Sequence, residues 1–428
     1  EHVFPLAPGS YASLDDDPEA VHDRQHYRLM CWRDGVISYR RFFSINGLAG
    51  VRQEDEDVFN ATHACLRELV GEGLIDGVRV DHPDGLTDPF GYLTRLRELV
   101  GRDAWLIVEK ILAADEPLDP RLNIDGTTGY DALREFDGVF VNPDAAGQLG
   151  DTAYRYSGAR WDQPAVEVAE RALKARVAEE EFAAEVRRLA RAVRHDNLSP
   201  AGAAVTDAEL ARVLVALVAR MPVYRADYRS LSRVTSAVIA ELAQSPRGCN
   251  RAALDLVASA LAAHGEAAHR FAQVCGAVMA KGVEDTLFYR ACRLVALQEV
   301  GGAPGRFGVS TSEFHLLQDE RAQLWPRTMT TLTTHDTKRS EDTRARMLEI
   351  AELLVEMPRQ QQRGVVELAF GHLQGTLAKL QREIAGAKRN RKHQQRGTQD
   401  EPLNGADPGG TQHTLDRQPP VFRHHAVR

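Results

Sequence analysis

The side chains with the clearest capacity for chemistry are acids that follow short apolar segments. Asp81 closes a segment that begins at Val78 and stops at a turn containing Pro83 and Gly85, which is typical of a buried strand. Because side chains alternate along a strand, we expect Arg79 to lie on the same face as Asp81. A guanidinium beside a carboxylate favours the ionised form that a nucleophile needs.

Two further acids stand in similar places. Glu109 ends the apolar segment 105–109, and the residues between the two predicted strands, 92–100, have helical character. This strand–helix–strand unit would bring two carboxylates to the carboxyl ends of neighbouring parallel strands, where α/β folds place their chemistry. Asp336 follows the short β-branched run 329–334. An acid at a strand end can also be only a turn cap or an ion-pair partner, so the three segments carry the argument together.

Together these segments resemble the α-amylase clan of glycoside hydrolases. The closer similarity is to its family of (1→4)-α-D-glucan 1-α-D-glucosylmutases, which form maltooligosyltrehalose. The motifs that carry the resemblance are Gly77–Leu86, Ile107–Leu112 and Thr333–Asp342, supported by Arg40–Phe43, Gly126–Asp131 and Ala280–Thr286. As a set they are specific, because each has the expected content and chain order. Any one of them alone would indicate only the clan.

The resemblance implies an α/β fold, a partial (β/α)8 TIM barrel with an inserted helical subdomain. We expect six parts: a cleft-covering excursion of the barrel (1–56), barrel strands with the nucleophile and the acid/base (57–163), the inserted all-helical subdomain (164–297), a barrel segment with the third acid (298–350), an amphipathic helix (351–388) and a disordered C-terminal tail (389–428). The heptad-like apolar stripe 366–384 and the loss of apolar periodicity after it indicate the last two.

The clan's first motif, an Asp followed by an Asn-His pair, is absent from this sequence. The first residues also read like the middle of a longer sequence. We therefore expect the first three or so barrel strands to be missing. Because a barrel cannot close without them and an open sheet edge favours aggregation, we expect the chain as given to be inactive or poorly soluble.

Local patterns predict several helices. Phe182, Val186, Leu189 and Val193 are spaced as one face of an amphipathic helix. The stretch Thr206–Glu209 has the form of a capping box that opens the next helix. Residues 57–70 are predicted to form one helix, and residues 131–136 another.

Composition excludes some classes of function. The chain has 428 residues, 43% of them hydrophobic and 27% charged, and a net charge of −8, which suits a neutral sugar ligand and argues against nucleic acid. No apolar run approaches the roughly 20 residues that cross a bilayer. Five cysteines without a close pair or metal spacing indicate reduced, mainly buried thiols and a cytoplasmic protein.

The resemblance also implies roles for individual residues. Asp81 would be the nucleophile and Glu109 the general acid/base, whose apolar strand predicts a raised pKa. Asp336 would stabilise the oxocarbenium-like state. The substrate-binding candidates are Arg79, His82, His335, Lys338, Tyr130, Lys281, Glu284 and Asp285. Three of these assignments have equal alternatives: His82 could only pack at its turn, Tyr130 could be a core residue, and the 281–285 cluster could be a solvated face.

The implied reaction converts the reducing-end α-1,4 linkage of a maltooligosaccharide into an α,α-1,1 linkage without a metal or organic cofactor. Such transfer requires a reducing-end pocket that excludes water, and Lys338, Arg339 and 281–285 are candidates for its walls. A trehalose-releasing hydrolase would act after it. Ser44 and Gly47 replace acidic or larger polar residues of the family, so we expect no sugar contact there.

Other functions remain open from the sequence. The same acids would serve an α-1,4-glucan hydrolase or a branching transferase of the clan, or they could persist in a glucan-binding fragment without catalysis. A metal phosphohydrolase is a weaker alternative, prompted by His335–Asp336 and by Asp81-His82-Pro83-Asp84. The other metal ligands that such an enzyme would need, at helical spacing, are missing from the sequence.

Overall fold

The computed structural model describes residues 5–13, 16–29, 36–37, 39–196, 204–245 and 250–356. The chain divides into two compact units, Glu1–Glu352 and Leu353–Arg428, and only residues 353–356 of the second are described. The predicted apolar stripe 366–384 and the tail 389–428 lie outside the described residues.

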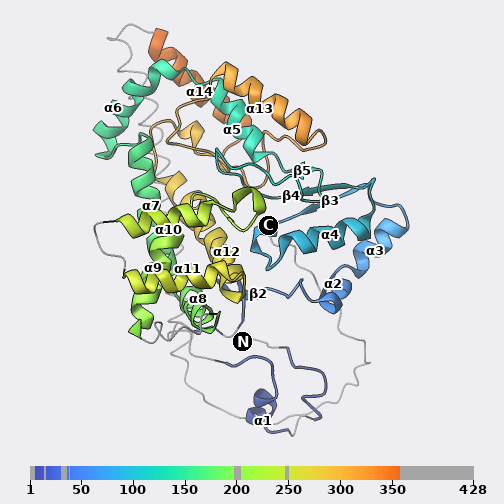
Figure 1. Cartoon of the computed structure of the whole chain (residues 1–428). Coiled ribbons are helices and arrows are strands. Elements are labelled where there is room, and N and C mark those ends of the chain that lie inside the picture. The colour runs from blue at the N-terminus through green and yellow to red at the C-terminus, as the bar shows by residue number, and fades with distance from the viewer. Residues whose placement is uncertain are drawn as a thin grey trace, which may run out of the picture. The chain divides into compact units, whose positions relative to one another are not determined.

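The strands that precede the candidate acids Asp81 and Glu109 belong to a small parallel sheet in the first unit. It consists of β3 (Gly77–Val80), β4 (Trp105–Val108) and β5 (Gly126–Thr127), in the order β3-β4-β5, and the three strands run together in Figure 1. A separate antiparallel hairpin pairs β1 (Arg41–Phe42) with β2 (Ile45–Ala49). The α/β class is thus observed, with short strands that end one residue before Asp81 and Glu109. The eight-stranded barrel stays a prediction.

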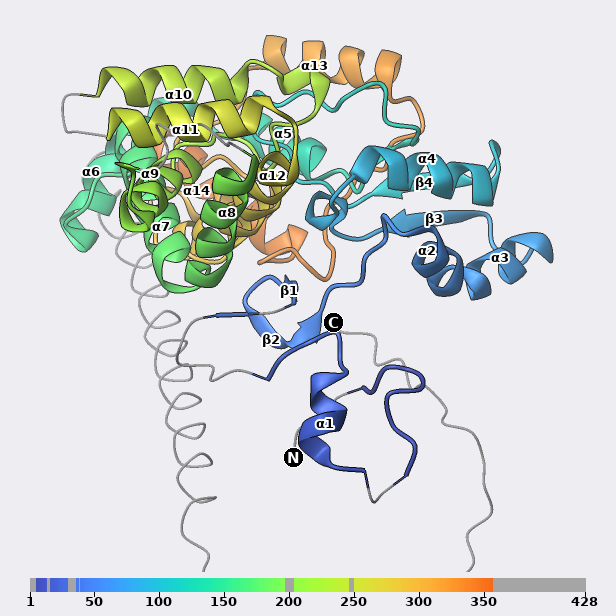
Figure 2. The same cartoon turned by 60° about the horizontal axis from the view of Figure 1, so that its bottom comes forward.

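The helix α4 (Pro89–Val100) connects β3 to β4, as the sequence predicts. Its first turn is capped by Asp88, whose side chain accepts a hydrogen bond from the Gly91 amide at 2.9 Å, and it ends at Gly101 with a positive φ. Its apolar face and the side chains of β4 are buried in the same core, at Leu93, Leu96, Leu106 and Val108. Figures 1 and 2 show α4 beside the strands.

The single helix expected over 57–70 is wrong. The structure has α2 (Glu56–Thr62) and α3 (Ala64–Gly71), separated at His63. The buried His63 ring bonds the Phe59 carbonyl at 2.8 Å and the Tyr92 hydroxyl at 2.9 Å, and it stacks on the Phe59 ring. Because these contacts hold His63 in a non-helical conformation, with φ −104° and ψ 9°, the helix breaks there.

Helices dominate the chain after residue 163. They are α7 (Gln163–Glu180), α8 (Ala183–Asp196), α9 (Asp207–Val218), α10 (Val234–Gln244), α11 (Arg251–Ala262) and α12 (Glu266–Met279), gathered together in Figures 1 and 2. The predicted apolar face of α8 is confirmed, because Val186, Leu189 and Val193 are at most 3% exposed. The capping box at Thr206 is also confirmed. The six-part division of the chain remains a prediction.

A π-helical turn (Ala280–Glu284) continues α12. The remaining helices are α1 (Pro18–Asp23), α5 (Tyr130–Val139), α6 (Ala146–Ser157), α13 (Thr311–Leu324) and α14 (Glu341–Glu356). The run 329–334 forms no strand. It still starts beside β5, where the Met329 amide donates to the Thr127 carbonyl at 3.3 Å. Among the described residues no helix has the length and apolar character to cross a membrane.

The cysteine expectation is only partly right. Cys275 is buried, whereas Cys65 is exposed on α3, and neither is in a disulfide. Cys31 and Cys249 lie outside the described residues.

The close approach of residues 329–330 to the end of β5 gives a stability prediction. Gly129 has φ +95°, and a Cβ there would collide with the Met329 carbonyl and the Thr330 backbone, whereas Gly158, with φ +70°, has open space around it. We expect Gly158→Ala to cost about 1–2 kcal/mol from backbone strain. Gly129→Ala should cost a further ~1–3 kcal/mol from the collision. Urea unfolding of the two variants measures the difference, and equal losses would contradict the close packing.

Candidate active site

The two leading acids follow paired positions of neighbouring strands. Val80 of β3 is in register with Val108 of β4, and the Glu109 amide donates to the Val80 carbonyl at 2.8 Å. Asp81 and Glu109 therefore leave the sheet at the same edge, on parallel strands whose spacing is about 4.8 Å. The amide of His82 then donates to Oε2 of Glu109 at 3.0 Å. The loop after β3 and the end of β4 thus form one local unit.

Arg79 connects the acids of this edge. Its guanidinium donates to Oδ1 of Asp81 at 3.0 Å and lies 3.9 Å from Oδ2 of Asp336, while its Nε donates to the Thr128 hydroxyl at 3.2 Å. The alternation argument for Arg79 and Asp81 is confirmed by this contact. Two carboxylates that are far apart in sequence therefore share one cation.

Asp336 is held by groups from two segments. The Tyr130 hydroxyl donates to its Oδ2 at 3.1 Å and also bonds the Thr334 hydroxyl at 2.9 Å. His335 Nε2 lies 3.1 Å from the same carboxylate. The Tyr130 ring is fully buried at the start of α5, so this residue is both a core side chain and a site contact. Burial, together with the nearby charge of Asp336, raises the pKa of the Tyr130 phenol, which keeps it a donor.

Glu109 has the electrostatics of a proton donor. Burial raises the pKa of its carboxyl to about 8, and the negative charges of Asp81 and Asp84 act in the same direction. The hydrogen bond from the His82 amide and the charge of Arg79 oppose this only partly. Near pH 7 Glu109 is therefore mainly protonated, as the apolar strand predicts. Asp81 is exposed, so the two acids have different environments, which is how one site separates acid and nucleophile roles.

His82 packs at its turn and also borders the acids. Its backbone is left-handed, with φ 45°, and its ring centroid is 4.6 Å from that of Phe43 and 5.9 Å from that of Phe42. Burial lowers the pKa of His82 despite the charges of Asp84 and Asp81. A neutral imidazole thus stands one residue after the candidate nucleophile.

A buried ion pair behind the site was missed in the sequence. Lys110 donates to Oδ2 of Asp84 at 2.9 Å and lies 3.0 Å from Glu116, and the Tyr228 hydroxyl donates to Oδ1 of Asp84 at 3.0 Å. Burial opposes the charge of Asp84, but Lys110 nevertheless holds its pKa below the ordinary value. Asp84 and Lys110 both stand inside the motifs, next to the assigned residues. This position was the available signal.

The second missed residue is Arg225, which is fully buried. It comes from the chain between α9 and α10, yet its guanidinium donates to the carbonyls of Asp84 (2.9 Å), Leu86 and Thr87 (3.3 Å). Asp227 balances its charge, with Oδ1 accepting at 2.8 Å. The helical part of the chain is therefore hydrogen-bonded, through Arg225, to the turn that follows Asp81. No local pattern indicates this contact, which spans more than a hundred residues.

The remaining substrate-binding candidates are engaged with one another. Lys338 donates to Glu284 at 3.1 Å, and both side chains are nearly buried. Burial raises the pKa of Glu284, and Lys338 acts against it. Lys281 donates to Asp285 at 2.6 Å and lies 4.5 Å from the Phe43 ring centroid. The 281–285 cluster thus reaches the Phe43–His82 contact through Lys281, whereas Glu284 points into the protein.

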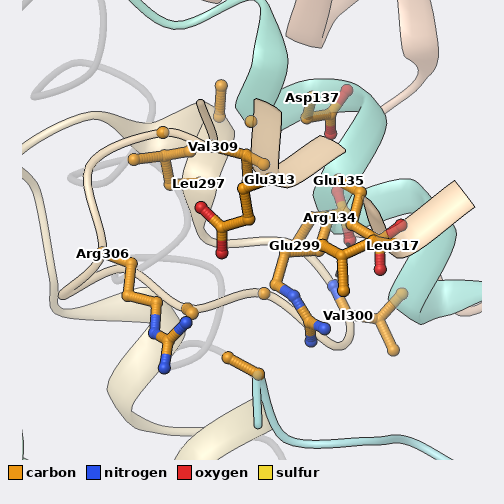
Figure 3. A pocket seen from close by; sticks show the side chains of 16 residues that line it. Arg134, Glu135, Asp137, Leu297, Glu299, Val300, Arg306, Val309, Glu313 and Leu317 are labelled. Carbon is orange, nitrogen blue, oxygen red and sulfur yellow. Dashed lines mark hydrogen bonds between the residues drawn. The ribbon is translucent and has the colours of Figure 1, made fainter. Parts of the chain in front are cut away.

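Away from these acids, the described residues contain no metal-ligand cluster but do contain a further cavity. No three His, Cys, Asp or Glu side chains are grouped there as ligands of one metal ion would be. A cavity of about 200 Å³ lies between α5, α13 and residues 296–309, lined by Arg134, Arg306, Glu313 and Leu317 among others (Figure 3). It contains none of the three candidate acids. Its Arg134 donates to the carbonyls of Leu112 and Gly301 at 3.0 and 2.9 Å.

Similar proteins are found among curated proteins and among solved structures. No family model matches the chain. A Mycobacterium tuberculosis protein named as a maltooligosyl trehalose synthase is 50% identical over 345 residues, which is 81% of this chain and 43% of the relative. The structure of maltooligosyltrehalose synthase from Arthrobacter ramosus matches with a TM-score of 0.71 at 42% identity, covering 85% of this chain and 46% of that one.

A more distant structure, a hypothetical maltooligosyl trehalose synthase from Sulfolobus tokodaii, matches with a TM-score of 0.63 at 29% identity, over 82% of this chain and 44% of that one. The chain therefore spans less than half the length of these relatives.

The raised pKa of Glu109 predicts a pH-dependent gain in stability from Glu109→Gln. Below about pH 4.5 the carboxyl is neutral in both the folded and the unfolded protein. Between that pH and about 8, the folded protein holds a proton that the unfolded chain releases, so the stability of the wild type falls as pH rises. An amide has no such cost. We expect Glu109→Gln to raise the melting temperature at pH 9 by several degrees more than at pH 5.

The matched control is Glu98→Gln, which removes an exposed carboxylate of α4 and should show no such pH dependence. A Glu109→Gln effect of the same size at both pH values would contradict the buried, protonated acid.

Proposed function

Because this chain is a homologue of the maltooligosyl trehalose synthases over 345 of its residues, we propose that it carries the catalytic acids of such a glucosylmutase. The reaction would move the terminal glucosyl linkage of a maltooligosaccharide from α-1,4 to α,α-1,1. The observation that carries the proposal is the register of β3 and β4, which brings Asp81 and Glu109 to one edge beside Arg79 and Asp336.

The strand geometry is compatible with a retaining mechanism. Retaining enzymes hold two carboxyl groups about 5–5.5 Å apart across the scissile bond, and the spacing of adjacent parallel strands, about 4.8 Å, is compatible with this separation. Asp81, exposed and hydrogen-bonded to Arg79, would attack the anomeric carbon. Glu109, protonated near pH 7, would give its proton to the departing glycosidic oxygen. A covalent glucan–Asp81 ester and a free reducing-end glucose would result.

The second half of the reaction reverses these roles. Glu109, now ionised, would take the proton from the anomeric hydroxyl of the retained glucose as that oxygen attacks the glucan's anomeric carbon, which is bonded to Asp81. The bond to Asp81 then breaks, and the new linkage joins two anomeric carbons. Asp336, held by Tyr130 and Arg79, would hydrogen-bond sugar hydroxyls and stabilise the positive charge that develops on the ring. No residue beyond these acids needs to change its protonation state.

To retain the released glucose, the side chains that line its pocket must stay in fixed positions. We assign this role to Lys338, Arg339 and the 281–285 cluster. The Lys338–Glu284 and Lys281–Asp285 ion pairs and the hydrogen bond from the Arg339 guanidinium to the Gln298 carbonyl at 3.2 Å support it, because they fix the three cationic side chains. Fixed walls limit the access of water, which would otherwise attack the ester and give hydrolysis.

We extend the proposal to the fold, the substrate and the location of the protein. The parallel strands would be part of a (β/α)8 barrel, with the helices from α7 to α12 as an insertion in it. The substrate would be a maltooligosaccharide, and the product would pass to a trehalose-releasing hydrolase. The protein would act in the cytoplasm.

A chimera tests the proposal in the context of a complete relative. The segment of the Arthrobacter ramosus enzyme that matches this chain is replaced by the corresponding residues of this chain, and the product formed from maltopentaose is analysed by NMR. We expect an α,α-1,1 anomeric signal. Asp81→Asn in the chimera should lower the rate by about 10⁴-fold or more, because it removes the nucleophile.

The other products separate the alternatives. Free glucose and maltotetraose without the new linkage would indicate a hydrolase, and longer branched products a branching transferase. A chimera that has the relative's circular dichroism spectrum and binds maltopentaose, but turns nothing over, would indicate a glucan-binding remnant. Each of these outcomes contradicts the proposal.

A further inference from the structure

A small cavity lies next to the turn that follows Asp81, and four arginines stand among its otherwise largely apolar and aromatic lining. It has a volume of about 90 Å³ and lies between the β1–β2 hairpin, α8, α12 and the turn after β3. The charged residues among its described lining are Arg40, Arg41, Arg188, Arg270 and Glu185. Four arginines and one glutamate leave a strong excess of positive charge in a partly enclosed space.

Two of the arginines have their own acidic partners. Arg41 donates to both oxygens of Glu185, at 2.8 and 2.7 Å, so the lining carboxylate is already used. Arg270 pairs with Glu266, one turn earlier on α12. These two guanidiniums are therefore neutralised within the protein.

The other two, Arg40 and Arg188, carry the positive charge that no directly bonded acid offsets. Within the described residues neither has a carboxylate within ion-pair distance. Arg40 donates instead to a neutral group, the amide oxygen of Gln273, at 3.0 Å in the orientation that the donors around this amide require. Burial lowers the pKa of both Arg40 and Arg188. The charge of Arg270 acts in the same direction on both, whereas Glu54 near Arg40, and Glu266 and Glu185 near Arg188, partly offset it. The cations are thus close enough to repel one another.

Like charges held together in a partly buried space are costly unless a ligand neutralises them. The guanidinium group offers parallel N–H donors that match the oxygens of phosphate. The volume suits a small anionic group, because pockets for larger organic ligands have about 300–1,000 Å³. We propose that this cavity binds a phosphate group, either free or carried by a sugar, between Arg40 and Arg188.

The cavity is coupled to the candidate acids through His82. The His82 ring lines it together with Phe42 and Phe43, and the His82 amide donates to Glu109. A phosphate bound there would lie against the turn after Asp81, so its binding should affect the positions of Asp81 and Glu109. This inference does not rest on the proposed glucosylmutase function, because phosphate binding can be measured without turnover.

Isothermal titration calorimetry of the 428-residue chain with inorganic phosphate tests the proposal. We expect saturable binding at one site at low ionic strength, and an affinity weakened about tenfold or more in Arg188→Gln and Arg40→Gln, since each variant loses a charge-assisted hydrogen-bond donor. Arg188→Lys should retain part of the affinity. Arg176→Gln, which removes an exposed arginine of α7 paired with Glu180, is the matched control and should bind as the wild type does.

Two further arms identify the source of the phosphate group. Tighter binding of glucose 6-phosphate than of inorganic phosphate would identify a phosphorylated sugar, and equal binding would identify the free anion. Glucose alone should not compete. Circular dichroism of each variant shows whether it folds, and a phosphate-dependent rise in the melting temperature of the wild type gives an independent measure. Absence of phosphate binding to the wild type, or binding to Arg188→Gln and Arg40→Gln as tight as to the wild type, would overturn the proposal.

Discussion

The pairing of β3 with β4 is the constraint on which the site depends. Val80 and Val108 are in register, so the next residue of each strand, Asp81 and Glu109, emerges at the same level. A slip of one residue would send one of these side chains to the opposite face. The buried side chains of β4 prevent such a slip, because Leu106, Ile107 and Val108 are each at most 2% exposed. Hydrophobic packing thus fixes the relative position of two acids that would otherwise repel one another.

Buried charged residues hold the turn after β3 in place. Two contacts hold the far end of the turn after β3. Asp84 pairs with Lys110, and Arg225 donates to carbonyls of the turn. Breaking a buried pair is strongly destabilising, because it leaves an unpaired charge away from water. Arg225 also links the helical part to the candidate site. Its guanidinium is a direct connection from the helices to the turn that carries the candidate nucleophile.

Local features of the fold were predictable and long-range contacts were not. The strands that end just before Asp81 and Glu109, the apolar face of α8 and the cap at Thr206 follow from neighbouring residues, and the structure has all of them. The helix break at His63 depends on its hydrogen bond to Tyr92, and the turn after β3 is held by Arg225. Both partners are distant in sequence, so the local hydrophobic pattern does not indicate either contact. The run 329–334 has β-branched residues but forms no strand, because tertiary context decides strand formation more than propensity does.

The central claim is that Glu109 is protonated at neutral pH because it is buried next to Asp81. A ¹³C NMR titration of the Glu109 carboxyl measures this directly, with Glu109→Gln used to assign the signal. The account predicts a midpoint near pH 8 that moves to lower pH in Asp81→Asn, since that variant removes a negative charge. A midpoint near the ordinary glutamate value of about 4.3, unchanged by Asp81→Asn, would contradict it.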